Sequence, residues 1–308
     1  MKCKKLLILG STGSIGINAL EVVSEKKDLF EIVGLAAHRN ESSLLEQAAR
    51  FGVSKLALSG TLPKDTRIRY YGMEGLLHLI EDSDADIVLN GIAGAAGFLP
   101  SIKSIQTGKH LALANKETLV MAGELVLAEA KKRGIAILPV DSEHSAVFQM
   151  ITRFDKNAIQ GIVLTASGGA FRDLPKERLS SVTPALALNH PTWNMGKKIT
   201  IDSASLANKG LEVIEAHHLF EMPPERIQVM IHPQSYVHSL IETKDGNFYA
   251  QIGKPDMRIP ILNALTYPEI LPHSIGKLSL TNLQLSFFEP DREKYPMLPL
   301  AYQALRKG

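Results

Sequence analysis

Two short segments of this sequence concentrate carboxylates, an ammonium group and hydroxyls. The first, residues 140–144 (VDSEH), follows the apolar run 135–140 (IAILPV), which predicts a buried strand. Asp141 and Glu143 are two residues apart at the carboxyl end of that strand. We therefore expect their side chains to turn to the same side, because side chains alternate along a strand.

The second segment, residues 202–212 (DSASLANKGLE), has the spacing of one helix face. Asn208 lies four residues before Glu212, and Lys209 lies three before it, so one face can present an amide, a cation and a carboxylate. Three carboxylates with an ammonium group and hydroxyls suit a hard divalent cation that holds an oxygen-rich, phosphorylated ligand. Taken alone, Asp141 and Glu143 fit solvated charge at a helix start about equally well.

A glycine-rich turn near the N-terminus predicts a nucleotide site. The short apolar strand 5–9 runs into residues 10–16 (GSTGSIG), and an amphipathic helix follows with Ile17, Leu20 and Val23 at helical spacing. This order is typical of dinucleotide-binding folds, in which glycines let the backbone approach a pyrophosphate and N–H groups at the helix start bind it. The spacing is GxxGxxG rather than GxGxxG, so a glycine turn without a ligand remains the alternative.

The end of the expected second strand, residues 31–37, indicates which dinucleotide is bound. An NAD enzyme places an acidic residue there, about 20 residues past the glycines, to bind the ribose 2′-hydroxyl. This chain has His38, Arg39 and Asn40 at that place, and Glu31 is at the opposite end of the strand. Because a guanidinium suits a 2′-phosphate, the sequence predicts NADP(H).

Length and composition frame these sites. The 308 residues are enough for about two domains, and 45% of them are hydrophobic. No apolar run approaches the roughly 18 residues that a membrane helix needs, so we expect no membrane partner. The single cysteine, Cys3, excludes an internal disulfide and favours a reducing, cytoplasmic location. The net charge of +2 and the lack of a basic block argue against nucleic-acid binding.

The first 140 residues alternate between apolar strand patterns and helical patterns, which predicts an α/β fold with a Rossmann-like, doubly wound parallel sheet. Ligands of such folds bind beyond the carboxyl ends of the strands, where the glycine turn and residues 90–97, 115–117 and 141–144 fall. The expected strands are 5–9, 31–37, 55–58, 86–90, 110–114 and 135–140, and the expected helices are 41–51, 74–81, 99–107 and 117–132.

The pattern changes after residue 150 and predicts an α+β catalytic domain. A strand at 160–165 ends in a small-residue loop, 166–169 (ASGG), that can form an anion-binding nest. Residues 171–198 are proline-rich and irregular, which predicts a lid. A helix at 203–220 and an antiparallel sheet follow, with Asp245-Gly246 as a hairpin turn. The expected strands of that sheet are 227–231, 237–243 and 248–252.

The ordered motifs resemble the 1-deoxy-D-xylulose 5-phosphate reductoisomerase family of the non-mevalonate isoprenoid pathway. The resemblance implies an enzyme that rearranges and reduces 1-deoxy-D-xylulose 5-phosphate to 2-C-methyl-D-erythritol 4-phosphate with NADPH and Mn²⁺ or Mg²⁺. The matching motifs are GSTGSIG (10–16), GAAG (94–97), LANKE (113–117), PVDSEH (139–144), TASGG (165–169), HPTWNMG (190–196), DSASLANKGLE (202–212), IHPQS (231–235) and GKPDMR (253–258).

The resemblance also implies residue roles. The metal ligands are Asp141, Glu143 and Glu212. The substrate and its phosphate contact Ser142, Glu143, Ser167, His190, Trp193, Met195, Ser203, Asn208, Lys209 and Glu212, with Trp193 and Met195 in the lid. The cofactor contacts Thr12, Gly13, Ser14, Ile15, Arg39, Asn40, Asn115, Glu117 and Gly196. Catalytic roles fall to Lys116, Glu143, His144, His190 and Lys209.

The expected organisation has an NADPH-binding domain at 1–140, a catalytic metal- and substrate-binding domain at 141–286 and a connector at 287–308. The family's C-terminal helical domain is expected to be absent, and His38 stands where family members commonly carry a small residue. The resemblance implies a cytoplasmic homodimer whose partner is a small sugar phosphate. Two alternatives remain: an NADP-dependent dehydrogenase without the isomerase step, which the three carboxylates oppose, and a truncated, non-catalytic NADP-binding remnant.

Overall fold

The computed structural model describes residues 3–193 and 195–307, so Asn194 of the 190–196 motif and of the expected lid lies outside the described part. The contacts divide the chain into two compact units. The first comprises Met1–Asp141 and Met257–Ser274, and the second comprises Ser142–Asp256 and Ile275–Gly308. The expected domain 141–286 therefore differs from the structure at Met257–Ser274, which groups with the N-terminal unit.

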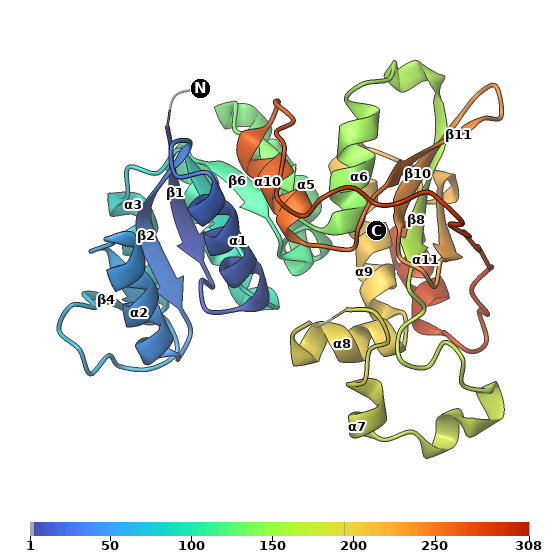
Figure 1. Ribbon diagram of the computed structural model, residues 1–308, viewed down its shortest axis with the longest axis horizontal. Coiled ribbons are helices and arrows are strands. Elements are labelled where there is room, and N and C mark those ends of the chain that lie inside the picture. The colour runs from blue at the N-terminus through green and yellow to red at the C-terminus, as the bar shows by residue number, and fades with distance from the viewer. Residues whose placement is uncertain (1–2, 194, 308) are drawn as a thin grey trace. The chain divides into compact units, whose positions relative to one another are not determined.

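The first unit contains a seven-stranded sheet with the order β4-β3-β2-β1-β5-β6-β7 (Figure 1). Every pairing between its neighbouring strands is parallel, which confirms the doubly wound α/β prediction. The chain order reverses between β1 and β5, and ligands of open α/β sheets bind at such a point. The strands are β1 (Lys4–Leu9), β2 (Phe30–Ala37), β3 (Leu56–Leu58), β4 (Tyr70–Tyr71), β5 (Ile87–Asn90), β6 (His110–Leu113) and β7 (Ile137–Pro139).

Helices cover this sheet, as buried parallel strands require. Figure 1 shows α1 and α10 side by side, and these two helices are in contact. The sequence pattern predicted α2, α3, α4 and α5 to within two residues at each end and a helix without stated bounds at α1, but it did not predict β4 or α10. The helices are α1 (Ser14–Glu25), α2 (Glu41–Phe51), α3 (Gly72–Asp82), η1 (Ala95–Gly97), α4 (Phe98–Gln106), α5 (Lys116–Arg133) and α10 (Arg258–Thr266).

The buried face of α1 differs from the expected one. Leu20 and Val23 are buried as predicted, whereas Ile17 is 46% exposed. Gly16 lies against the strand instead, because a Cβ at this position would collide with the backbone of Gly10 and Ser11. The glycine therefore lets the start of α1 approach the end of β1 closely.

The second unit contains a four-stranded sheet with the order β11-β10-β8-β9. The predicted antiparallel sheet is wrong for β9, which pairs with β8 in parallel, whereas β10 is antiparallel to both of its neighbours. The reason is the long helical connection between β8 and β9, since parallel strands need a crossover of this kind. The predicted Asp245-Gly246 hairpin joins β10 to β11. The strands are β8 (Ile159–Ala166), β9 (Ile227–Ile231), β10 (Val237–Thr243) and β11 (Phe248–Ile252).

The helices of the second unit differ more from expectation. The expected helix 203–220 is two helices, which break at Leu206, where φ is +55° and the side chain is 2% exposed. The expected irregular stretch 171–198 contains two short helical turns, and α6 was not predicted. None of the helices within residues 3–193 and 195–307 is long and apolar enough to cross a membrane. The helices are α6 (Ser142–Ile151), η2 (Lys156–Ala158), η3 (Lys176–Ser181), α7 (Pro184–Ala187), α8 (Lys197–Ala204), α9 (Ala207–Phe220), η4 (Pro224–Arg226) and α11 (Met297–Lys307).

The expected connector 287–308 contributes to the core of the second unit. Helix α11 packs against α9. Tyr295 and Leu298 are 4% exposed and join the apolar cluster that contains Val213 and Ile241. The side chains around α9 are therefore held from both sides, by the sheet and by α11.

Candidate functional site

The glycine turn joins β1 to α1 and forms the predicted nucleotide loop. Gly10 has φ of +76°, and a Cβ at this position would lie 2.8 Å from Gly91 O, so only glycine fits between the ends of β1 and β5. Gly13 is the N-cap of α1 and has no side chain to cover the first N–H groups of the helix. The structure thus brings together Thr12, Gly13, Ser14 and Ile15 at a helix N-terminus suited to a pyrophosphate.

The end of β2 presents the residues predicted to recognise the 2′-phosphate. Arg39 is exposed. Asn40 caps α2, because its side-chain oxygen accepts a hydrogen bond from Ser43 N at 3.2 Å. His38 Nδ1 lies 3.2 Å from Ser59 Oγ, and its ring lies so close to Gly60 that a side chain there would collide with it. Ser59 and Gly60 therefore both lie beside the ring of the unusual histidine.

Asn115 organises the loop that follows β5. Its amide nitrogen donates to Ile92 O at 2.6 Å and Gly94 O at 2.8 Å, while its oxygen accepts from Thr118 N and caps α5. The same amide lies 3.2 Å from the Glu117 carboxylate. Both residues predicted to contact the cofactor thus fix the loop beside the switch point between β1 and β5.

Three carboxylates lie close to one another, near the start of α6 and on α9. Asp141 is the last residue of the first unit and directly precedes α6, and Glu143 lies in the first turn of that helix. The predicted strand alternation is therefore wrong, because the chain becomes helical at Ser142. Carboxylate oxygens of Asp141, Glu143 and Glu212 nevertheless lie within 4.8 Å of one another, and Glu212 is 1% exposed.

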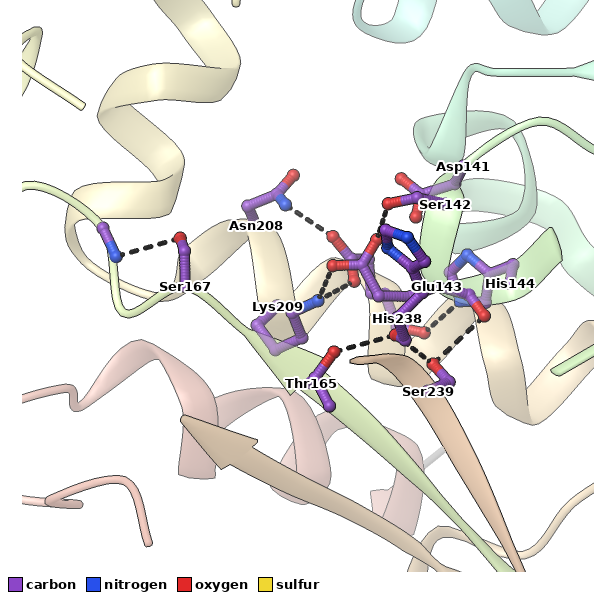
Figure 2. Close-up of polar contacts among 12 residues, drawn as sticks. Asp141, Ser142, Glu143, His144, Thr165, Ser167, Asn208, Lys209, His238 and Ser239 are labelled. Atoms are coloured by element: carbon purple, nitrogen blue, oxygen red, sulfur yellow. Dashed lines mark hydrogen bonds and ion pairs between the residues drawn. The ribbon is translucent and has the colours of Figure 1, made fainter. Parts of the chain in front are cut away.

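Cationic and amide groups surround these carboxylates. Lys209 Nζ lies 2.7 Å from Glu143 Oε1 and also contacts Glu212, and Asn208 donates to Glu212 Oε1 at 2.5 Å (Figure 2). Lys116 Nζ, 5% exposed in the first unit, lies 2.8 Å from Asp141 Oδ2. Three carboxylates and two ammonium groups leave one negative charge. This all-oxygen donor set fits Mg²⁺ or Mn²⁺ better than zinc.

His144 lies behind the carboxylates and is fully buried. Its Nε2 is 3.0 Å from Glu212 O, and its Nδ1 is 3.2 Å from Glu215 Oε2. These contacts join α6 to the backbone of α9, which favours a positioning role over the catalytic role expected from the sequence. The sequence reasoning did not find Glu215, although its place three residues after Glu212 on one helix face was a usable signal.

Ser239 supports the same site from the sheet, and the sequence reasoning did not find it either. Its hydroxyl donates to Glu143 O at 3.1 Å from β10 (Figure 2). Ser142 Oγ donates to Glu143 Oε2 at 2.6 Å, so the predicted substrate residue touches a predicted metal ligand. Glu143 is thus fixed through its backbone and its carboxylate.

Ser167 and His190 form a second polar site in the same unit. His190 Nδ1 accepts hydrogen bonds from Thr192 N at 3.1 Å and Trp193 N at 2.9 Å. Nε2 therefore carries the proton and donates to Ser167 Oγ at 2.9 Å. Burial, with a smaller contribution from the nearby Arg172 charge, lowers the pKa of His190 below its ordinary value. The ring is consequently neutral near pH 7.

The turn after β8 adds backbone donors beside Ser167. Gly168 and Gly169 have φ of +88° and +67°, and a side chain on Gly169 would collide with Ser203 O. Ser203, at the end of α8, therefore packs directly on the turn. Successive N–H groups at such glycines form an anion-binding nest.

The remaining predicted residues lie at the start of α8. Gly196 is the N-cap of this helix, and Met195 is half-buried just before it. Trp193 is also half-buried, in the segment whose backbone binds His190. Their predicted contacts with cofactor and substrate stay predictions.

Family models match three parts of the chain. Residues 6–123 match 1-deoxy-D-xylulose 5-phosphate reductoisomerase, and residues 137–220 match the C-terminal domain of the same enzyme. Residues 252–308 match a DXP reductoisomerase C-terminal domain.

Relatives with this name match nearly the whole chain. The reductoisomerase of Geotalea daltonii is 50% identical and that of Chlorobaculum tepidum 49%, each over 99% of this chain and 82% of the relative. A crystal structure of DOX-P reductoisomerase with NADPH, fosmidomycin and magnesium has a TM-score of 0.92 at 40% identity, over 99% of this chain and 80% of that one. The Zymomonas mobilis enzyme with NADPH has a TM-score of 0.90 at 37% identity, over 99% and 82%.

Proposed function

Because this chain belongs to the 1-deoxy-D-xylulose 5-phosphate reductoisomerase family, we propose that it converts 1-deoxy-D-xylulose 5-phosphate to 2-C-methyl-D-erythritol 4-phosphate with NADPH and a divalent cation. The observation that carries the proposal is the carboxylate cluster of Asp141, Glu143 and Glu212, held by Lys209 and Asn208. A simple NADP-dependent dehydrogenase has no need of such a cluster.

The three carboxylates would hold the cation, and the substrate would complete its coordination. Mg²⁺ and Mn²⁺ accept carboxylate, hydroxyl and carbonyl oxygens, and a bound cation polarises the carbonyl and the adjacent hydroxyl of the ketose. Lys209 holds Glu143 and Glu212 adjacent, because its ammonium group contacts both. Lys116 contacts Asp141 in the same way.

The substrate phosphate is assigned to the turn at residues 167–169. Ser167 Oγ accepts from His190, so its own hydroxyl proton is available to donate to an anion. Ser203 packs on the same turn, while Asn208 and Lys209 begin the next helix. A neutral His190 provides a fixed N–H donor without adding charge.

The cofactor is assigned to the glycine turn. The N–H groups at the start of α1 would bind the pyrophosphate, and Arg39 would bind the 2′-phosphate as a guanidinium–phosphate pair. The nicotinamide supplies hydride to the aldehyde that the rearrangement produces. Two of the matching crystal structures contain NADPH, which agrees with this assignment.

Residues 171–198 are proposed as the lid over the substrate. Its described residues, which leave out Asn194, are mostly exposed and contain only the short helices η3 and α7 before α8. Substrate binding would order it, since closure excludes water from the reaction. Limited proteolysis should cut it in the free protein and be suppressed by a phosphonate mimic; equal cleavage with and without the mimic contradicts the lid.

We also propose a cytoplasmic homodimer that pairs through β11. This strand is the edge of its sheet, and Phe248, Tyr249 and Ile252 are 55%, 43% and 44% exposed along it. Unpaired edges of this kind bind a second strand readily. Sedimentation should give a dimer, and Ala250→Pro should shift it toward monomer; a monomeric wild-type protein contradicts the pairing.

Product analysis tests the function. The protein is incubated with 1-deoxy-D-xylulose 5-phosphate, NADPH and Mn²⁺, and the carbon skeleton of the product is determined by NMR. The proposal predicts a branched polyol phosphate. A linear polyol phosphate would identify a simple dehydrogenase, and the absence of product together with intact NADPH binding would identify a non-catalytic remnant.

A further inference from the structure

The turn at residues 167–169 has its backbone carbonyls held by side chains from outside the turn. Arg172 Nη1 donates to Ser167 O at 3.1 Å, and Tyr295 Oη donates to Gly168 O at 3.3 Å. Tyr295 is 4% exposed and lies 127 residues from Gly168 in the sequence. Consecutive peptide groups of the turn are thus fixed by one local and one distant side chain.

These bonds set the direction of the N–H groups. In a trans peptide the C=O of one residue and the N–H of the next point in opposite directions. Holding Ser167 O therefore directs Gly168 N–H away from Arg172, and holding Gly168 O directs Gly169 N–H away from Tyr295. Gly169 N lies 3.3 Å from Ser167 Oγ, the atom that also accepts from His190. The Gly169 N–H group thus points to Ser167 Oγ, on the side of the turn that carries His190.

A third side chain, that of Lys294, stabilises the positions of Arg172 and Tyr295. Lys294 Nζ donates to Arg172 O at 2.8 Å and Leu174 O at 2.7 Å, and it lies 5.4 Å from the centre of the Tyr295 ring. Burial raises the pKa of Tyr295 to about 12, so its hydroxyl remains a donor at neutral pH.

The stem of Arg172 also fits the turn closely. A Cβ on Gly168 would lie 2.7 Å from Arg172 Cγ, so the arginine packs directly on the glycine backbone. Its guanidinium group pairs with Asp173 at 2.8 Å in addition to Ser167 O. The arginine therefore acts both as packing and as a donor, and lysine could replace only part of this role.

We propose that Arg172 and Tyr295 are positioning residues for phosphate recognition: Arg172 orients the Gly168 N–H group, and Tyr295 orients the Gly169 N–H group onto Ser167 Oγ, which leaves the Ser167 hydroxyl to donate to the substrate phosphate. This inference rests on the proposed function of the turn as the phosphate site. Neither residue touches the phosphate itself. Each acts by holding a carbonyl on the far side of the turn.

The chain supplies a matched control for the test. Tyr302 lies on α11, and its hydroxyl donates to Ile227 O at 2.8 Å, at the opposite end of β9 from Ile231, which pairs with Ala166 next to the turn. Its pKa is likewise raised to about 12 by burial. Tyr295→Phe and Tyr302→Phe therefore each remove one buried phenol-to-carbonyl hydrogen bond, and only the first bond belongs to the turn.

The measurements are KM for the sugar phosphate, the inhibition constant of inorganic phosphate, the Kd of NADPH and the melting temperature. Tyr295→Phe should raise KM and the phosphate constant by about fivefold to tenfold, the worth of one oriented hydrogen bond, and leave NADPH binding unchanged. Tyr302→Phe should change the melting temperature alone. Arg172→Met should weaken phosphate as Tyr295→Phe does, and Arg172→Lys should restore part of the loss.

Two results would overturn the inference: an unchanged phosphate constant in Tyr295→Phe, or an equal rise in Tyr302→Phe. If wild-type protein does not turn over the sugar phosphate, the proposed function fails. Direct calorimetric titration of wild-type and Tyr295→Phe protein with inorganic phosphate then tests the positioning role separately. The substitution should again weaken phosphate binding by about fivefold to tenfold.

Discussion

The two turns proposed to bind anions are built in opposite ways. The glycine turn at residues 10–16 uses only local means, because Gly10 and Gly16 let a helix start directly behind a strand. The turn at residues 167–169 ends a strand without a helix directly behind it, and Tyr295 reaches it from 127 residues away. One site depends on backbone conformation alone, and the other depends on the packing of a distant segment. Mutations should therefore damage the two sites by different routes.

The largest effect should come from the cluster of Asp141, Glu143 and Glu212. Glu212→Gln keeps the size of the side chain but removes a charge that a cation needs and one of two acceptor oxygens, so turnover should fall by about a thousandfold while NADPH binding persists. Glu225→Gln is the matched control, because Glu225 is an exposed residue 3.7 Å from Arg306. Steady-state kinetics and NADPH fluorescence give both quantities. Near-normal turnover in Glu212→Gln would refute the assignment of this carboxylate.

Substitutions in the glycine turn should weaken cofactor binding by disturbing the backbone. Gly10→Ala places a Cβ 2.8 Å from Gly91 O at a φ of +76°, so NADPH affinity should fall by about a hundredfold. Gly52→Ala is the control, since Gly52 has φ of +68° and no atom within 4 Å of its Cβ position. NADPH titration separates the cost of positive φ from the steric cost. Equal affinities in the two variants would show that close approach does not matter here.

Cofactor discrimination should depend on a side chain rather than on the turn. Arg39→Asp replaces a phosphate partner with a repelling charge, so NADPH binding should weaken by about tenfold or more and NADH binding should change little. Arg69→Asp is the control, because Arg69 is exposed and precedes the amino end of the edge strand β4, whereas Arg39 follows the carboxyl end of β2. Competitive titration with both nucleotides measures the ratio. Wild-type protein that binds NADH as tightly as NADPH would contradict the assignment.

The smallest effect concerns stability in the second unit. Burial lowers the pKa of His232, and it lowers that of His238 to about 4, from an ordinary value of 6.5. Both rings stay neutral in the folded protein while they gain protons on unfolding. The contribution of His238 to the unfolding free energy should therefore be constant above pH 6.5 and fall as the pH drops toward 4, by up to about 1.4 kcal/mol per pH unit, and His232 should act in the same direction. Urea unfolding of wild-type and His238→Gln protein measures the slope, which should be shallower in the variant; identical slopes would contradict it.

The accuracy of the predictions made from the sequence also differs between the two units. The first unit was predicted well, because its strands, helices and glycine turn follow from local patterns. The break at Leu206 was not predicted, since its positive φ is stabilised by burial of the side chain in the core. The parallel pairing of β9 was not predicted, because strand order depends on the crossover. Arg172 and Tyr295 were not found, because neither belongs to a motif that carries chemistry on its own.

The metal ligands show what a resemblance can add to such reasoning. From spacing alone, strand alternation predicted that the side chains of Asp141 and Glu143 lie together. In the structure they lie together at the start of α6 instead. Glu212 comes from a different helix, so local spacing could not place it beside them. The resemblance named all three, and the carboxylate oxygens lie within 4.8 Å of one another.

The most direct test of the account is metal binding by the carboxylates themselves. Electron paramagnetic resonance of Mn²⁺ titrated into the full chain counts bound ions without reference to turnover. The account predicts one bound Mn²⁺ per chain in wild-type protein and in Glu225→Gln. It predicts a large loss of binding in Glu143→Gln and in Glu212→Gln. Undiminished Mn²⁺ binding when Glu143 and Glu212 are both replaced by glutamine would contradict the metal site and the mechanism that depends on it.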